Sequence, residues 1–287
     1  MIPGDSAFPE GITEDPDGEH FFVCSHRTGT VFRCGIGQPE AEVWLPGGQD
    51  GRTALIGMTT DRRGRLFACG GETGHVFAYE LASGRLLAQR TVPSEPTLLN
   101  DMCVVGEFLY VTDSKRPVVW RFDVTDGLGE PELWLDLTRH GADETDLHYL
   151  NGIVPTHDGA VLVMAAQGTG RLWRVDVATG AAEPIDLGTA VVNGDGLVYV
   201  GDVLYVCDNS EEPDGSVRMW LTALRLTDDA RGGSVIGRWE RPLTDTPSTV
   251  AHLGDRLYIV NAQHFAHFAG QEPKPPFTVS ALDVPIR

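Results

Sequence analysis

The chain has 287 residues, of which 41% are hydrophobic, so it is long and apolar enough to bury a sizeable core. Its formal net charge of −19 argues against nucleic acid and anionic lipid as partners, because a field of that sign repels both. No apolar run is long enough to cross a bilayer. We therefore expect a small-molecule substrate, with no nucleic acid and no membrane as a partner.

The N-terminal segment and the cysteines suggest a compartment. Residues 1–11 lack the basic and apolar regions of a secretory signal, which favours a cytoplasmic protein or one whose leader has been removed. The five cysteines are odd in number and form no C-x-x-C pair. This usage indicates reduced thiols and argues against a disulfide framework.

In chain order, six stretches of sequence repeat one plan. Each starts with a short apolar strand and continues through a turn rich in Gly and Asp into a second strand, and most copies add another turn and a third strand. β-Branched and aromatic residues favour strands, and the glycines suit tight turns. The second strands read, from first to last, FFV, LFA, LYV, VLV, LYV and LYI. The stretches begin at Pro9, Leu55, Leu99, Leu150, Gly194 and Pro247.

The spacing of these stretches predicts the fold. Their second residues are separated by 46, 44, 51, 44 and 53 positions, which suits one four-stranded propeller blade per repeat. We predict an all-β, six-bladed β-propeller with four-stranded antiparallel blades, forming one domain over residues 1–287. A sandwich or two small β domains would not repeat one motif from end to end. Residues 132–150 are expected to form a connecting loop with one helical turn, and residues 275–285 to pair with the N-terminal blade and close the ring.

The second residue of each repeat is a candidate for the functional site. The innermost strands of a propeller line its central channel, so residues at one register converge on the axis. Two carboxylates and two carboxamides would then meet, and a cation would relieve the repulsion between the carboxylates. Any one of them alone is more readily explained as a turn residue, so the interpretation depends on their joint occurrence. The register residues are Glu10, Ile56, Asn100, Asn151, Asp195 and Ser248.

The donor set indicates the kind of ion. All the donors at Glu10, Asn100, Asn151 and Asp195 are oxygens, which favours a hard cation. Ca²⁺ takes six to eight oxygen ligands, so positions would stay open for water and substrate. Ca²⁺ is the expected cofactor, with Mg²⁺, Mn²⁺ and Zn²⁺ as alternatives.

Two residues just before Asn151 are expected near the same mouth of the channel. His148 and Tyr149 would each serve as a proton shuttle or a substrate contact. The alternative is that they are ordinary loop residues on the rim. His252, His264 and His267 are weaker candidates.

Several short motifs carry a family resemblance over the whole chain. The sequence resembles the senescence-marker-protein-type (regucalcin and gluconolactonase) family of calcium-dependent six-bladed propellers. The resemblance implies hydrolysis of lactones or organophosphates. The motifs are PEGI at 9–12, LND at 99–101, LNGIVPTHDG at 150–159, GDGL at 194–197 and LYIVNAQ at 257–263.

The resemblance also implies individual roles. Glu10, Asn151 and Asp195 match the metal ligands of the family, and Asn100 matches a further Asn that ligates the metal or contacts the substrate. The residue that matches Asp195 is also the favoured general base or nucleophile. One departure is Leu98, because sugar-lactone members have an Arg at that position that contacts the substrate.

The sequence therefore predicts a metal-dependent hydrolase of a lactone or related ester. Two alternatives remain. One is a lyase, cyclase or isomerase of a biosynthetic pathway that uses the same site, and the other is a non-enzymatic propeller with a structural ion.

Overall fold

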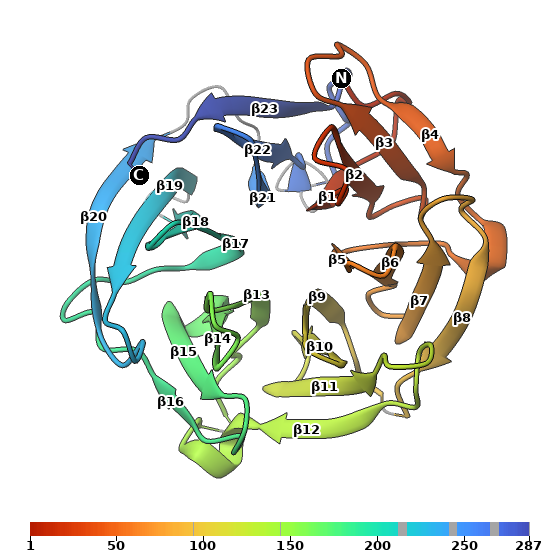
Figure 1. The fold of residues 1–287 in the computed structure, drawn as a ribbon. Helices are drawn as coiled ribbons and strands as arrows, with labels where there is room; N and C mark the ends of the chain where they lie inside the picture. Colours follow the sequence, from red (N-terminus) through yellow and green to blue (C-terminus); the bar gives the residue numbers. More distant parts are fainter. Residues whose placement is uncertain (94, 144, 212–216, 241–245, 265–269, 287) are drawn as a thin grey trace.

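Six antiparallel sheets surround a central axis in the computed structural model of the chain (Figure 1). The structure describes residues 1–286 except 94, 144, 212–216, 241–245 and 265–269. The predicted all-β, six-bladed propeller is confirmed. All five cysteines are buried and free, as their number and spacing suggested.

The first three blades run from residue 9 to residue 136. Blade 1 contains β1 (Pro9–Glu14), β2 (His20–Ser25), β3 (Val31–Gly35) and β4 (Glu42–Leu45). Blade 2 contains β5 (Met58–Thr60), β6 (Arg65–Cys69), β7 (His75–Glu80) and β8 (Leu86–Thr91). Blade 3 contains β9 (Leu99–Val105), β10 (Phe108–Asp113), β11 (Val118–Asp123) and β12 (Glu132–Asp136).

The last three blades continue the same order around the axis. Blade 4 contains β13 (Leu150–Pro155), β14 (Val161–Ala166), β15 (Arg171–Asp176) and β16 (Ala182–Pro184). Blade 5 contains β17 (Gly194–Val200), β18 (Val203–Glu211), β19 (Val217–Leu226) and β20 (Gly233–Glu240). Blade 6 contains β21 (Pro247–Leu253), β22 (Arg256–Asn261) and β23 (Thr278–Asp283).

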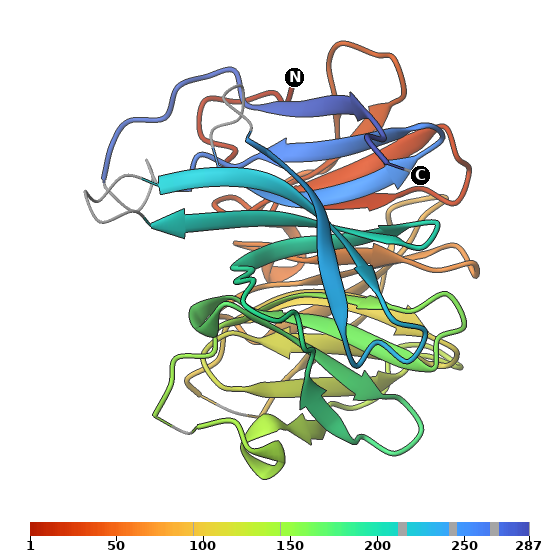
Figure 2. The same cartoon turned by 90° about the vertical axis from the view of Figure 1, so that its left-hand side faces the viewer.

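Short helical turns and one long hairpin complete the description. The turns are η1 (Gln49–Gly51), η2 (Leu137–His140) and η3 (Gln167–Thr169). The expected loop at 132–150 does contain a helical turn, but its first five residues form the outer strand β12. Seen from the side, the hairpin of β18 and β19 reaches beyond the neighbouring blades on one face (Figure 2). No helix within the described ranges combines the length and apolarity required to cross a membrane.

The ring closes differently from the prediction for the C-terminal tail. Strand β23 pairs with β22 of its own blade, so the tail supplies the third strand of blade 6. The N-terminal segment meets the tail at one isolated bridge, in which the amide of Ile2 donates to the carbonyl of Phe277 at 2.9 Å. Phe8 packs on Phe277, with 5.1 Å between ring centroids, inside a core cluster that joins blades 1 and 6. Apolar packing, more than strand pairing, therefore seals the ring.

Five of the six innermost strands are irregular at the position that the sequence singles out, and in blade 2 that position, Ile56, precedes β5. In blades 1, 3, 4, 5 and 6 the pairing with the second strand is interrupted immediately after the first residue of the inner strand. Such a bulge turns a side chain out of the regular pleat. The register residue lies within this interruption in all five blades.

Small residues next to the register allow the inner strands to crowd around the axis. A Cβ added at Gly11 would overlap the carbonyl oxygen of Ile56 in the next blade, and one at Gly152 would overlap that of Asp195. Gly57 has the same relation to Asn100. Glycine is therefore required at these positions by close backbone approach. The same close approach brings the register residues together.

Candidate functional site

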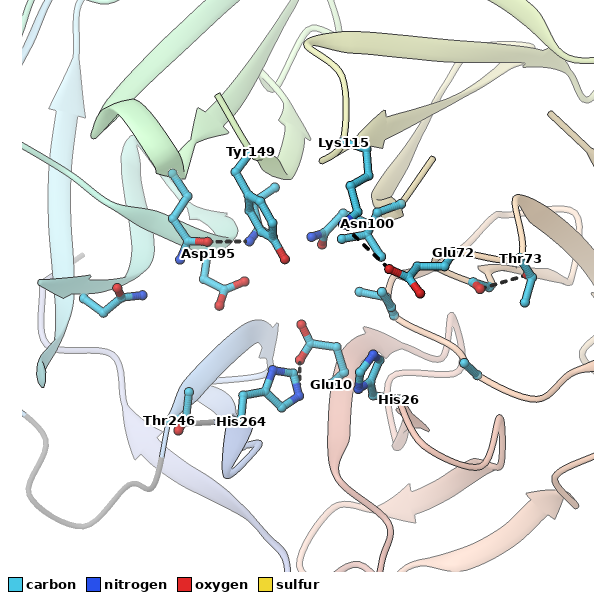
Figure 3. Close-up of a pocket in the computed structure, with 18 residues that line it drawn as sticks. Glu10, His26, Glu72, Thr73, Asn100, Lys115, Tyr149, Asp195, Thr246 and His264 are labelled. Carbon is cyan, nitrogen blue, oxygen red and sulfur yellow. Dashed lines mark hydrogen bonds and ion pairs between the residues drawn. The ribbon is translucent and has the colours of Figure 1, made fainter. Parts of the chain in front are cut away.

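An axial cavity of about 620 Å³ opens at one mouth of the channel, and most of the predicted site residues line it (Figure 3). Five of the six register residues contribute to its wall: Glu10, Ile56, Asn100, Asn151 and Asp195. Ser248, the sixth, is fully buried, and its Oγ lies 3.1 Å from the carbonyl oxygen of Glu10, to which it donates. Residues that are far apart in the sequence thus meet in one cavity, as the repeat predicts.

The carboxylate of Glu10 is buried and poorly satisfied. Its residue is 5% exposed, and no hydrogen-bond donor of the described residues reaches Oε2. The His264 ring lies close to it, with 3.6 Å between Nε2 and Oε2, and would pair with it as a cation only when protonated. Burial raises the pKa of Glu10 to about 7, although Ser248 and His26 lower it in part.

The carboxyl group of Asp195 is also buried, and its pKa is also raised. Burial raises its pKa well above the ordinary value, and the charges of Glu10 and Asp101 raise it further. A hydrogen bond from Asn151 lowers it only in part. Without an added positive charge, Asp195 favours its protonated form near neutral pH, and Glu10 is only partly ionised there.

The two amides present their oxygens to the cavity. Asn100 uses its Nδ2 to donate to Ser114 Oγ at 2.9 Å, and Asn151 uses its Nδ2 to donate to Gln167 Oε1 at 3.2 Å. Because these bonds occupy the nitrogens, the amide oxygens remain acceptors for a ligand. The partners come from the ends of the second strands, so each amide is oriented by its own blade.

These residues fit a divalent cation. Two buried carboxylates with raised pKa, one orphaned carboxylate oxygen and two oriented amide oxygens form a hard donor set. No Lys or Arg of the described residues pairs with Glu10 or Asp195, so the protein itself supplies no full positive charge to them. Glu10, Asn100, Asn151 and Asp195 are the residues that would hold the ion.

The two residues before Leu150 point in different directions. Tyr149 lines the axial cavity and adopts a positive φ of 49°, and burial followed by the charge of Asp195 raises its pKa to about 12. His148 lies instead in a neighbouring side pocket of about 390 Å³, where its Nε2 is 2.8 Å from the carbonyl oxygen of Asp143. The structure thus places Tyr149, but not His148, among the residues that line the cavity.

Several cavity residues were not identified from the sequence, or were given low weight. Most come from turns between strands, where the repeat sets no register, and so only their polar character pointed to them, whereas Asn209 lies near the end of β18. The rings of His26 and His264 lie 5.4 Å apart beside Glu10. The others are Glu72, Lys115, Gln167, Asn209 and Thr246.

A second acidic group lies away from the axis, in the turn between β1 and β2. Asp15, Asp17 and His20 offer ligand atoms within 4.8 Å of one another, and they are the one such His, Cys, Asp and Glu group found in the described part of the chain. Arg33 Nη2 already lies 3.1 Å from Asp15 and 3.0 Å from Asp17. The guanidinium group of Arg33 therefore already neutralises part of the negative charge of this group.

Fold and site together define a six-bladed β-propeller with an acidic, oxygen-lined axial cavity. A family model described as outer membrane protein assembly factor BamB matches residues 42–272, and the chain belongs to this family. No curated protein matches the chain in sequence.

Solved structures show the same fold at low sequence identity. A calcium-binding protein, regucalcin from Agrobacterium tumefaciens, is similar with a TM-score of 0.68 and 17% identity, covering 97% of this chain and 90% of its own. Streptogramin B lyase has a TM-score of 0.65 and 13% identity, covering 91% and 92% of the two chains. A catalytically inactive virginiamycin B lyase from Staphylococcus aureus, solved with quinupristin, has a TM-score of 0.66 and 12% identity, covering 91% and 94%. At these identities the likeness establishes the fold alone.

Proposed function

We propose that the chain is a metal-dependent enzyme that hydrolyses a lactone or related ester in the axial cavity, as the resemblance to the regucalcin and gluconolactonase family implies. The observation that carries the proposal is the convergence of two buried, high-pKa carboxyl groups with two oriented amide oxygens and no Lys or Arg partner within the described residues. A scaffold gains nothing from such an arrangement, since burying unpaired carboxylates is costly.

A bound Ca²⁺, or in its place Mg²⁺, Mn²⁺ or Zn²⁺, would supply Lewis-acid polarisation of a carbonyl oxygen. Glu10, Asn100, Asn151 and Asp195 would hold it. Asn100 and Tyr149 would also contact the substrate from the wall of the cavity.

Asp195 would act as the general base. Its carboxylate accepts the proton of the attacking water, which requires that it be ionised before the reaction starts. Because its pKa is raised well above the ordinary value, Asp195 is a poor base in the metal-free protein. Positive charge in the cavity lowers that pKa. Metal removal should therefore abolish activity through the base as well as through carbonyl polarisation.

The test is lactone turnover with and without a chelator, combined with direct metal analysis. Chelator-sensitive turnover that is lost in Asp195→Asn supports the proposal. Asp202→Asn is the matched control, because Asp202 lies in the turn of the same β17–β18 hairpin, is 68% exposed and pairs with Arg225 at 2.9 Å. Full activity of Asp195→Asn would refute the assigned base. Metal binding without turnover would favour the lyase-type enzyme or the non-enzymatic propeller with a structural ion, and a protein that binds no metal would reject both metal-dependent enzymes.

A second candidate is a lyase, cyclase or isomerase that uses the same site. The observation in its favour is the histidine pair, because His26 and His264 lie beside Glu10 where a substrate C–H bond would meet a base. Product mass separates the two reactions, since hydrolysis adds one water to the substrate whereas isomerisation and ring opening by elimination leave the mass unchanged.

A further inference from the structure

Lysine is a rare residue in this chain, and one of the two lysines lines the axial cavity. Of the 22 Lys and Arg residues, lysine occurs only at positions 115 and 274. Among the described residues, the other ion pairs that involve Lys or Arg are made by arginine. Lys115 is therefore unlike the usual surface cation of this protein. Its compact ammonium group also differs from the planar fork of arginine, so the two are not equivalent in recognition.

The backbone of Lys115 is fixed by a buried carboxylate. Asp113 accepts hydrogen bonds from Thr97 Oγ1 at 2.6 Å, from the amide of Leu98 at 3.0 Å and from the amide of Lys115 at 3.1 Å. Between them, Ser114 accepts from Asn100 and donates to the carbonyl oxygen of Leu150 at 2.6 Å. The turn that carries Lys115 is thus built into the same network that orients Asn100.

Lys115 is the one Lys or Arg among the described residues that line the cavity. Its partner is Glu72, from the turn between β6 and β7, with 3.7 Å between Nζ and Oε1 (Figure 3). The two side chains are 42% and 75% exposed. A long ion pair between exposed groups is worth little, so a ligand anion can replace Glu72.

The position of Lys115 also joins two hollows. Lys115 and Tyr149 line both the axial cavity and the side pocket that contains His148. A ligand held at Lys115 would therefore have room on both sides of the ammonium group.

We propose that Lys115 binds a carboxylate of the substrate, so that the enzyme acts on an acidic ester or lactone whose reacting carbonyl lies nearer Asp195. This inference rests on the proposed function. One ammonium group matches a monoanionic carboxylate. A phosphate would call for more donors, and the neighbouring Arg116 already faces Asp113, with 3.5 Å between Nη2 and Oδ2.

The experiment compares two probes, monomethyl glutarate and dimethyl glutarate, which differ by one negative charge. Their affinities for the full chain are measured by calorimetry, with and without added Ca²⁺. We expect the monoester to bind about tenfold more tightly than the diester, as for a hydrogen bond to a charged group. Lys115→Gln should remove that preference, and Lys115→Arg should keep part of it. Lys274→Gln is the matched control for the loss of one lysine and should keep all of it. Glu72→Gln should strengthen monoester binding, because the competing carboxylate is gone.

Equal affinities for the two probes, no detectable binding of the monoester, or a preference that survives in Lys115→Gln would each overturn the inference. The last result would mean that the carboxylate binds elsewhere, such as at the ion. Failure of the proposed function gives a different pattern. A Lys115-dependent preference without lactone turnover leaves this inference standing and rejects the hydrolase, whereas turnover without a preference does the reverse.

Discussion

Blade 1 contributes carboxylates to two acidic groups, one buried at the axis and one exposed in a turn, and only the exposed group is neutralised by an arginine. Glu10 lies at the start of β1 and faces the axial cavity, whereas Asp15 and Asp17 follow the end of β1 in an exposed turn. The turn group is built within one hairpin and is paired with Arg33. The axial group is assembled from different blades and has no Lys or Arg partner among the described residues.

The pKa values of the two groups shift in opposite directions. Burial raises the pKa of Glu10 to about 7. For Asp17 burial alone would raise the pKa, but hydrogen bonds from the Glu19 amide and from His20 leave it lowered overall. Close carboxylates therefore do not by themselves define a metal site. Carboxylates that are buried without a cation of the protein do define one, because a metal ion then offsets the free-energy cost of burying unpaired charges.

The largest expected effect is on metal affinity. Glu10→Gln removes a charged ligand from the axial group and should weaken Ca²⁺ binding by more than about 100-fold, since even outer-shell changes cost 10- to 100-fold. Asp17→Asn, the control, removes a charge from the group that Arg33 already neutralises and should leave the affinity unchanged. Calorimetry on both variants measures the difference. Equal losses in the two variants would show that the ion binds in the exposed turn instead.

The next effect is the pH dependence of stability in the metal-free protein. A carboxyl group whose folded pKa is raised stabilises the fold below its unfolded pKa, and this contribution is lost as pH rises through the folded pKa. For Glu10 the window runs from the ordinary 4.5 to about 7, and Asp101, raised by burial from 3.8 to about 7, acts in the same direction. Between about pH 5 and about pH 8 we expect Glu10 to contribute a loss of roughly 2–3 kcal/mol in the free energy of unfolding.

Denaturant titrations in the presence of a chelator measure this slope. Glu10→Gln should flatten it, because the variant has no proton to lose at that position, and added Ca²⁺ should reverse it. A slope that Glu10→Gln leaves unchanged would mean that Glu10 does not contribute to it, and that Asp101, Asp195 or the net charge of the protein sets the pH dependence.

The two acidic groups also mark what the sequence could predict. Glu10, Asn100, Asn151 and Asp195 were predictable because each occupies a fixed register of a repeated strand, and strand geometry carries that register into space. His26, Glu72 and Lys115 follow second strands, but their side chains lie in turns whose path depends on local packing. The third strand of blade 6 was assigned to the wrong neighbour for a related reason. The sequence of a single terminal strand does not determine which of two exposed strand edges it will pair with.

A third effect tests whether the axial group depends on close approach of the blades. Gly152→Ala would push a Cβ into the carbonyl oxygen of Asp195, and relieving that overlap must move β13 and β17 apart. We expect a loss of about 1–3 kcal/mol in stability, as for other overpacked sites, together with weaker metal binding. At Gly232 the nearest atom to an added Cβ is Asp186 O at 3.4 Å, an ordinary contact, so Gly232→Ala should change neither quantity appreciably. If Gly152→Ala kept full metal affinity, the ligand set would not depend on this contact.

The smallest effect is expected from the exposed turn itself. Asp17→Asn keeps an acceptor for the amides of Glu19 and His20, which lie 2.7 and 3.0 Å from Oδ1. It loses the charge on Oδ2, which lies 3.0 Å from Arg33 Nη2 and 2.8 Å from His20 Nδ1. Exposed ion pairs contribute at most about 1 kcal/mol, so the free energy of unfolding should fall by less than that. Since the pKa of Asp17 is lowered, its contribution is present above the unfolded value near 3.8 and is lost as the pH falls, opposite in sign to Glu10. A stability loss in Asp17→Asn that shrinks or becomes a gain as the pH rises from about 5 to about 8 would mean that this turn, too, holds an unneutralised carboxylate, and the distinction between the two groups would fail.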